Sequence, residues 1–153
     1  MTVGLLIHDD EVVAEYLFKH HVSPCMQYDQ ALGIMIDGQL SGGILLQSYN
    51  GFNVELSYYG SGTLTPGVIK CLARILVSTF NVSRVTVTVS RRSRRLMRSL
   101  RRLGFSLEGV QRCFYGHKDS TRNTGVRFVM FRPRVDKLCH WAPGKENSNA
   151  VAQ

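Results

Sequence analysis

Residues 84–112, RVTVTVSRRSRRLMRSLRRLGFSLEGVQR, carry the strongest structural signal in the chain. The stretch opens with valines alternating with threonines, and this period of two is typical of a strand. Leucines then recur at helical spacing, at Leu96, Leu100 and Leu103. Gly104 follows at a position that favours a left-handed helix cap, and residues 105–111 indicate a second strand. The stretch therefore predicts a compact strand–helix–strand unit.

The same region holds most of the positive charge. Residues 84–134 carry fourteen Lys/Arg and two Asp/Glu, a net charge of +12. Residues 1–83, in contrast, carry three Lys/Arg and seven Asp/Glu, a net charge of −4. Arginines outnumber lysines by fourteen to five in the whole chain, and the planar guanidinium suits phosphate and carboxylate. The arginines of residues 91–102 are interpreted in three ways: a solvated outer face, a phosphate site near the helix start, or contact with a nucleic acid or an acidic protein.

Length and composition indicate one globular domain. At 153 residues with 44% hydrophobic residues, the chain is large enough for a core without disulfides or metals. We predict a domain over residues 1–135 and a partly disordered extension over 136–153. No apolar run approaches the roughly 20 residues of a membrane helix, and the N-terminus lacks the pattern of a signal peptide. The four scattered cysteines indicate reduced thiols in a cytoplasm-like compartment.

The rest of the chain predicts the neighbours of the central unit. Residues 2–7 are expected to form a strand and to be followed by a helix. Residues 31–37, 40–48 and 52–59 alternate as three strands of a meander, separated by Asp-Gly and Asn-Gly turns. Thr65 and Pro66 have the residue types of a helix start, and residues 126–133 are expected to form the last strand. This order predicts a mixed, mostly antiparallel sheet with helices on both faces.

This order resembles the GNAT family of acyl-CoA-dependent N-acyltransferases. The resemblance rests on a meander ending in a glycine-containing loop at a helix start, on Leu103-Gly104-Phe105, and on the Glu108-Gly109 and Arg112 that follow. It covers about residues 30–133, and the sequence is also similar to short acetyltransferase-like proteins of tailed phages. The resemblance implies transfer of an acetyl group from acetyl-CoA to an amine, in a cytoplasm or, for a phage protein, a virion.

The resemblance also implies a binding site for acetyl-CoA. Backbone N–H groups at a helix start favour the pyrophosphate, and the preceding strand binds the pantetheine arm. The corresponding positions are Tyr58, Tyr59, Gly60, Ser61, Gly62, Thr63 and Thr65, and Arg91, Arg92 and Ser93 stand near the start of the following helix. Glu55, in the middle of its strand, is the candidate general base, because a carboxylate shielded from water takes up a proton more readily. The alternative for Glu55 is a solvent-facing strand residue.

The sequence departs from the family at three points. The loop lacks the family's Arg/Gln-x-x-Gly-x-Gly/Ala pattern, the usual asparagine is Ser93, and the usual tyrosine acid is Leu100. Tyr115 or Tyr58 is the candidate replacement for that acid. These departures favour a second hypothesis, in which the chain is an inactive GNAT-fold binding or structural subunit, such as a virion component, that uses its basic surface. The histidines lack metal-ligand spacing, so no metal site is predicted. The sequence is compatible with either a monomer or an oligomer.

Overall fold

A computed structural model describes residues 1–21, 27–60 and 64–141 of the protein. Strands and helices follow one another along these residues as β1 (Val3–Leu6), α1 (Asp10–His20), β2 (Gln30–Ile36), β3 (Gln39–Gln47), β4 (Asn53–Gly60), α2 (Pro66–Ser78), β5 (Arg84–Ser90), α3 (Arg94–Leu103), β6 (Ser106–Gln111), β7 (Gly125–Phe131) and α4 (Arg132–Leu138). None of the helices in these ranges is long and apolar enough to span a membrane. The three cysteines described, Cys71, Cys113 and Cys139, are free thiols.

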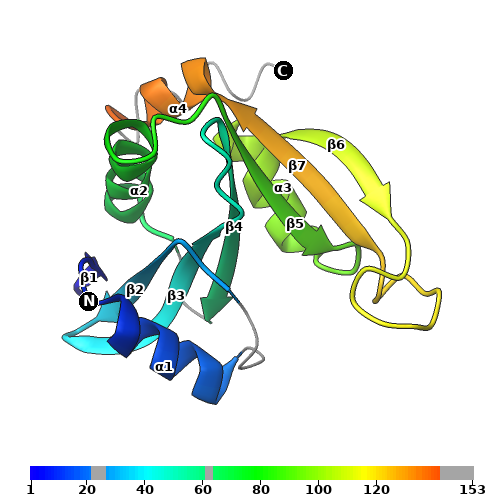
Figure 1. The fold of residues 1–153 in the computed structure, drawn as a ribbon, viewed down its shortest axis with the longest axis horizontal. Coiled ribbons are helices and arrows are strands. Elements are labelled where there is room, and N and C mark those ends of the chain that lie inside the picture. The colour runs from blue at the N-terminus through cyan, green and yellow to red at the C-terminus, as the bar shows by residue number, and fades with distance from the viewer. Residues whose placement is uncertain (22–26, 61–63, 142–153) are drawn as a thin grey trace.

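The strands form one seven-stranded sheet in the order β1-β2-β3-β4-β5-β7-β6 (Figure 1). The meander β2–β3–β4 is antiparallel, as predicted, and its register shifts between Ile34 and Met35, opposite the glycines of β3. Among the strand pairs of the described residues, only β4 and β5 run parallel. The mixed, mostly antiparallel sheet predicted from the sequence is therefore confirmed.

The two parallel strands separate part-way along their length. Residues 53–56 of β4 pair with residues 84–87 of β5, but β4 continues to Gly60 and β5 to Ser90 without further pairing between them. Figure 1 shows the two strands diverging from this short contact. Beyond Leu56 and Val87, the facing edges of the two strands therefore do not pair with each other.

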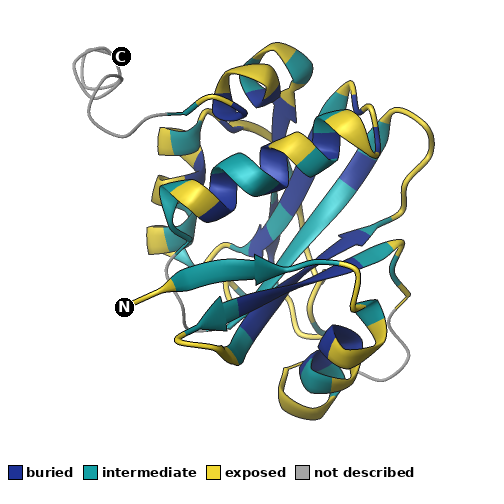
Figure 2. Cartoon of the chain, turned by 90° about the vertical axis from the view of Figure 1, so that its left-hand side faces the viewer, coloured by how far each residue is buried: buried dark blue, intermediate teal, exposed yellow. Residues whose placement is uncertain are grey.

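Helices cover both faces of the sheet, and each face has its own core (Figure 2). The helix α1 buries Val13 and Leu17 against Ala31 and Leu45. On the other face, the strands pack with α2, α3 and α4 around Phe128, which is fully buried. The alternation along β3 explains this division, because Leu45 belongs to the core under α1 whereas Ile44 and Leu46 belong to the other core.

The central strand–helix–strand unit forms as predicted. Val85, Val87 and Val89 of β5 are buried, and Leu100 is the buried residue of α3. Gly104 has φ of 108°, the left-handed cap conformation, and its N–H bonds back to the last turn of the helix. A side chain at this glycine would also collide with Arg134, because a Cβ would lie 2.6 Å from Nε.

The helix α2 begins where its sequence predicts. Thr65 occupies the N-cap, its Oγ1 accepts a hydrogen bond from the Val68 N–H at 3.3 Å, and Pro66 follows in the first turn. Just before this helix, the end of β4 packs backbone against backbone on β3. A Cβ on Gly42 would lie 2.2 Å from the carbonyl oxygen of Tyr59. The glycine at position 42 therefore allows the backbones of β3 and β4 to approach closely, and any larger residue there would force the end of β4 to shift.

The last strand forms as predicted but ends two residues early, and the helix that follows it was not predicted. Instead of a strand over residues 126–133, β7 ends at Phe131 and the helix α4 follows. Pro133 lies in the first turn of α4, where the missing N–H costs nothing. Val135 and Leu138 of this helix are buried against the core, and the Arg74 Nε donates to the carbonyl of Cys139 at 3.3 Å. The packed structure thus runs past residue 135.

Candidate functional site

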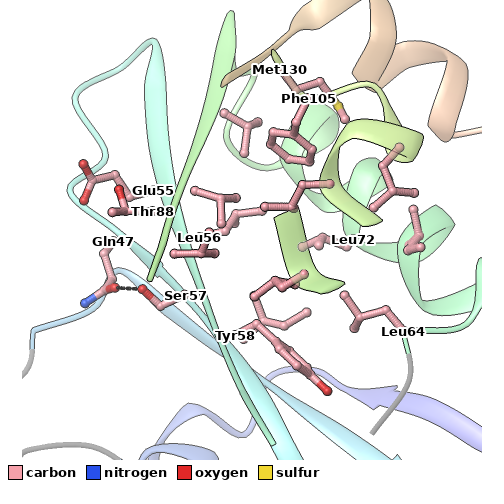
Figure 3. Close-up of a pocket in the computed structure, with 18 of the residues that line it drawn as sticks. Gln47, Glu55, Leu56, Ser57, Tyr58, Leu64, Leu72, Thr88, Phe105 and Met130 are labelled. Carbon is pink, nitrogen blue, oxygen red and sulfur yellow. Dashed lines mark hydrogen bonds between the residues drawn. The ribbon is translucent and has the colours of Figure 1, made fainter. Parts of the chain in front are cut away.

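A cavity of about 550 Å³ fills the space where β4 and β5 diverge (Figure 3). Its walls come from the two strands and from the helices α2 and α3, and Phe114 and Tyr115 lie at its rim. Leu56 and Tyr58 of β4 face the helical side, where Leu72 and Leu100 complete an apolar wall. The cavity is thus a direct product of the interrupted pairing between the parallel strands.

The opposite wall of the cavity is polar. It includes Gln47, Glu55, Ser57 and Thr88, which lie together on the side away from Leu72 in Figure 3. The alternation of β4 produces this contrast, because Glu55 and Ser57 point to the face opposite Leu56. The Ser57 Oγ donates to the Gln47 Oε1 at 2.7 Å. An apolar slot with a polar edge suits a ligand with a long, mostly apolar arm and a reactive polar end.

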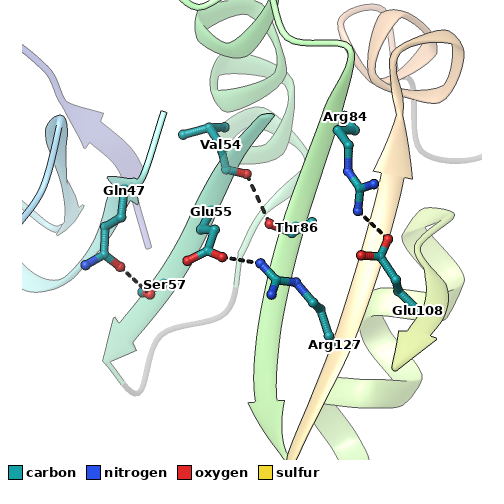
Figure 4. A network of polar contacts seen from close by, with 8 residues as sticks. All are labelled: Gln47, Val54, Glu55, Ser57, Arg84, Thr86, Glu108 and Arg127. Carbon is teal, nitrogen blue, oxygen red and sulfur yellow. Dashed lines mark hydrogen bonds and ion pairs between the residues drawn. The ribbon is translucent and has the colours of Figure 1, made fainter. Parts of the chain in front are cut away.

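Glu55 lies at the polar edge in an ion pair with Arg127 of β7 (Figure 4). The two side chains are 37% and 26% exposed, so the expectation that the carboxylate is shielded from water is wrong. The guanidinium fixes the position of the carboxylate, and the Arg127 Nε is buried without a hydrogen-bond partner. Glu55 therefore reaches the cavity as an ordered anion.

Tyr115 approaches the same cavity from the loop after β6. Its hydroxyl donates to the carbonyl oxygen of Thr88 at 3.1 Å, at the point where β5 leaves β4. Burial raises the pKa of the Tyr115 phenol above its ordinary value, and the neighbouring Tyr59 adds to the rise. The fold thus brings the two predicted catalytic residues, Glu55 and Tyr115, to one cavity.

A pH titration can detect tyrosine phenols that are partly shielded from water, although Tyr115 is still 48% exposed. Burial raises the pKa values of Tyr58, Tyr59 and Tyr115, so the folded protein keeps protons that the unfolded chain releases above the ordinary value of 10.0. The related stabilisation is complete below this pH and is lost as the pH rises above it. Ultraviolet absorbance should show late-ionising tyrosines that Tyr115→Phe reduces. A single step shared with the urea-unfolded protein would contradict this environment.

The predicted cofactor residues of β4 lie at the cavity or next to it. Tyr58 and Tyr59 line it, and Gly60 ends the strand with φ of 133°. Residues 61–63 of the prediction, Ser61, Gly62 and Thr63, lie outside the described residues. Thr65 uses its hydroxyl to cap α2, and Leu64 beside it lines the cavity. The cavity therefore leads from β4 toward the first turn of α2.

The predicted residues near α3 divide between two places. Ser93 lines the cavity, whereas Arg92 lines a neighbouring one, and Arg91 lines neither. The Arg91 N–H instead donates to the carbonyl of Thr124 at 2.9 Å. The arginines of residues 91–102 are all exposed, and none has an acidic partner among the described residues. Contact of this helix with a polyanion remains a prediction.

Sequence reasoning missed Arg127, Thr88 and Gln47. Arg127 had a signal, because it is a charge in the middle of the apolar run of β7. The other two are ordinary polar strand residues that acquire a role only from the divergence of the strands. Leu100, which the resemblance places at the family's usual tyrosine, lines the apolar wall.

No model of a known protein family matches the sequence, and no curated protein does. Solved structures match the fold. A GCN5-related N-acetyltransferase from Brucella melitensis has a TM-score of 0.63 at 15% identity, with 90% of this chain and 79% of that chain covered. A chimera of the Vibrio cholerae spermidine N-acetyltransferase SpeG with hSSAT has a TM-score of 0.68 at 10% identity, with 90% and 99% covered. The fold is that of the GNAT N-acetyltransferases.

A second form of the Vibrio cholerae SpeG enzyme matches the GNAT fold of this chain with a TM-score of 0.61 at 14% identity, over 82% of this chain and 75% of that one. In four other acetyltransferase structures this chain spans less than two thirds of the neighbour's length, 61% in the lowest case. At these identities the GNAT likeness establishes the fold, and the chemistry has to come from the site itself.

Proposed function

We propose that this protein is an N-acetyltransferase that binds acetyl-CoA between β4 and β5 and transfers the acetyl group to an amine. The divergence of the two parallel strands around an apolar cavity supports this proposal most strongly. The pantetheine arm of acetyl-CoA carries two amide groups on a narrow chain. Such an arm can pair with the edge of a strand as an added strand does, and β4 does not pair with β5 beyond Leu56.

In this proposal the phosphates of the same ligand lie at the start of α2. The dipole of a helix favours an anion at its first turn, although Pro66 has no N–H and the Val68 N–H donates to Thr65 Oγ1. In the sequence, residues 60–65 lead from β4 to that turn. We therefore assign cofactor binding to the residues predicted above: Tyr58 and Tyr59 in the strand, residues 60–65 in the connection, and Ser93 at the opposite rim. This assignment remains a proposal.

Glu55 and Tyr115 supply the acid–base chemistry in this proposal. Glu55, held by Arg127, accepts a proton from the acceptor amine through a water as the amine nitrogen bonds to the acetyl carbon. The carbon–sulfur bond then breaks, and the sulfur takes a proton from a phenol. Tyr115 is the candidate for this step because its phenol lines the same cavity beside Thr88 and carries a proton at neutral pH. Leu100, at the family's usual position for the acid, can donate no proton.

We expect the acceptor to be an amine whose binding is not opposed by the positive charge around the cavity. The V. cholerae neighbours act on spermidine, a polycation. Residues 84–134 of this chain carry a net charge of +12, which repels a polycation from the β5 side of the cavity. We therefore do not extend the spermidine activity to this protein, and we expect spermidine to be a poor acceptor.

Hydrogen exchange tests where the ligand binds. Saturating acetyl-CoA should slow the exchange of amides in residues 57–60 and in the first turn of α2 by about tenfold or more, because bound protein must release the ligand before it opens. Amides of β1 and β2 serve as the internal control and should not change. Protection that omits residues 57–60 would contradict binding between the diverging strands.

A further inference from the structure

A second cavity, of about 750 Å³, adjoins the first at the end of β5. The two share Ser90, Ser93 and Tyr115, so the apolar slot continues into the second space. Whereas the first cavity is mainly apolar, the second is lined by hydroxyls, an amide and three cations. Its lining residues are Ser90, Arg92, Ser93, Tyr115, Lys118, Ser120, Arg122 and Asn123.

The cations of this cavity lack acidic partners. Arg92, Lys118 and Arg122 form no ion pair among the described residues, and no carboxylate lines the cavity. Asp119 is the nearest acid in the sequence, but its carboxylate pairs with Arg112. Three like charges around one concave space repel one another unless an anion lies between them.

Hydrogen bonds hold the walls of the cavity together. The Ser90 Oγ donates to the carbonyl of Arg122 at 2.8 Å, and the Arg92 N–H donates to the same Oγ at 3.3 Å. The Asn123 Nδ2 donates to the carbonyl of Lys118 at 2.9 Å. These bonds tie the loop after β6 to the end of β5, so the three cations are attached to an ordered frame. An ordered frame reduces the entropy that binding would otherwise cost.

The start of α3 adds to the positive potential. Ser93 is the N-cap residue, yet its side chain makes no capping hydrogen bond, and the first turn contains no acidic residue. The first turn of the helix carries a partial positive charge at the end where Ser93 lines the cavity. Arginine and lysine side chains, hydroxyls and helix N–H groups are the donors that proteins use for phosphate.

We propose that the second cavity binds a phosphate-type anion carried by a ligand of the acetyltransferase site. This inference rests on the proposed function, because the cavity lies at the end of the slot assigned to acetyl-CoA. Two ligands could supply the anion. The group is either the 3′-phosphate of an acetyl-CoA whose pyrophosphate lies at the start of α2, or an anionic group of the acceptor. In the second case the enzyme acts on an amine that also bears a phosphate.

Two triple variants with the same change in charge test the cavity. The first is Arg92→Gln, Lys118→Gln and Arg122→Gln. The control is Arg95→Gln, Arg98→Gln and Arg102→Gln, three exposed arginines of α3 that line neither cavity. Titration calorimetry measures the binding of inorganic pyrophosphate to each protein alone. We expect pyrophosphate affinity to fall about tenfold or more in the first variant and not in the control, because charged hydrogen bonds are lost.

Two further titrations distinguish the sources. If acetyl-CoA supplies the phosphate, the cavity variant binds acetyl-CoA more weakly than the control does. It also loses the preference of the wild-type protein for acetyl-CoA over 3′-dephospho-acetyl-CoA. If the acceptor supplies it, acetyl-CoA affinity is equal in both variants, and pyrophosphate still binds to the wild-type protein loaded with acetyl-CoA.

The failure of this proposal differs from the failure of the proposed function. Equal pyrophosphate binding by the two triple variants would overturn the anion site, whatever acetyl-CoA does. If pyrophosphate binding depends on the cavity residues but the protein does not bind acetyl-CoA, the anion site is supported and the acetyltransferase proposal is excluded. Circular dichroism of both variants establishes that they are folded before titration.

Discussion

Glu55→Gln should lower kcat by about 10²- to 10⁴-fold, the usual contribution of a general base, while the affinity for acetyl-CoA changes little. Glutamine has the shape of glutamate but cannot take up the proton of the acceptor amine. The measurement is a steady-state assay of thiol release from acetyl-CoA with the best acceptor amine found, together with a binding titration.

Glu108→Gln is the matched control for this variant. Glu108 pairs with Arg84 on the same sheet, and the two side chains are 34% and 35% exposed, close to the values of the Glu55 pair (Figure 4). Neither residue lines a cavity described above. Each substitution should cost about 1 kcal/mol of stability or less, as partly exposed ion pairs do. Equal kcat values for the two variants would exclude Glu55 as the base.

Phe128→Ala should lower the free energy of unfolding by about 3–5 kcal/mol, which is much of the stability of a single domain. Phe128 is fully buried in β7, opposite Val87 of β5 and Leu107 of β6, and the Arg101 guanidinium lies 5.7 Å from the ring centroid. Its removal leaves a cavity beneath α3. Urea denaturation followed by circular dichroism measures the loss.

Phe131→Ala provides the comparison within the same strand. Phe131 is 55% exposed, and its only aromatic contact recorded in the described structure is with the Arg84 guanidinium, 5.9 Å from the ring centroid. Its truncation should cost about 1 kcal/mol or less. Losses of similar size for the two phenylalanines would show that Phe128 is not part of the main core.

The central elements of the fold could be predicted because their signals are local. The alternation of residues 85–89, the spacing of Leu96 and Leu100, and Gly104 each report a conformation that neighbouring residues determine. The predicted end of the last strand at Pro133 was wrong for the same reason, because it too relied on local sequence. A proline after an apolar run is as compatible with a strand end as with the first turn of a helix, and burial of Val135 and Leu138 decides between them.

The site was less predictable because it depends on distant pairings. Glu55 and Arg127 are 72 positions apart, and their ion pair requires β4, β5 and β7 to lie side by side. Thr88 becomes a cavity residue only because β5 stops pairing with β4 at Val87. The family resemblance supplied Glu55 as a candidate, and it had no means of supplying the guanidinium that accompanies it.

The structure divides the positive charges of residues 84–134 into groups with different surroundings. The arginines of α3 lie on its exposed side, whereas Arg92 joins Lys118 and Arg122 around a concave space next to the proposed acetyl-CoA slot. A sequence pattern cannot separate these two groups, because Lys118 and Arg122 belong to a loop far along the chain. The distinction matters for function, since only a concave group of cations can hold a small anion on several sides.

Titration calorimetry of the wild-type protein with acetyl-CoA tests the central claim most directly. We predict saturable binding at one site, with a dissociation constant on the order of micromolar to sub-millimolar and a negative heat-capacity change from burial of the ligand in the apolar slot. Free CoA should compete for the same site. Absence of saturable heat up to high micromolar acetyl-CoA would contradict the claim that the diverging strands of this GNAT fold form an acetyl-CoA site.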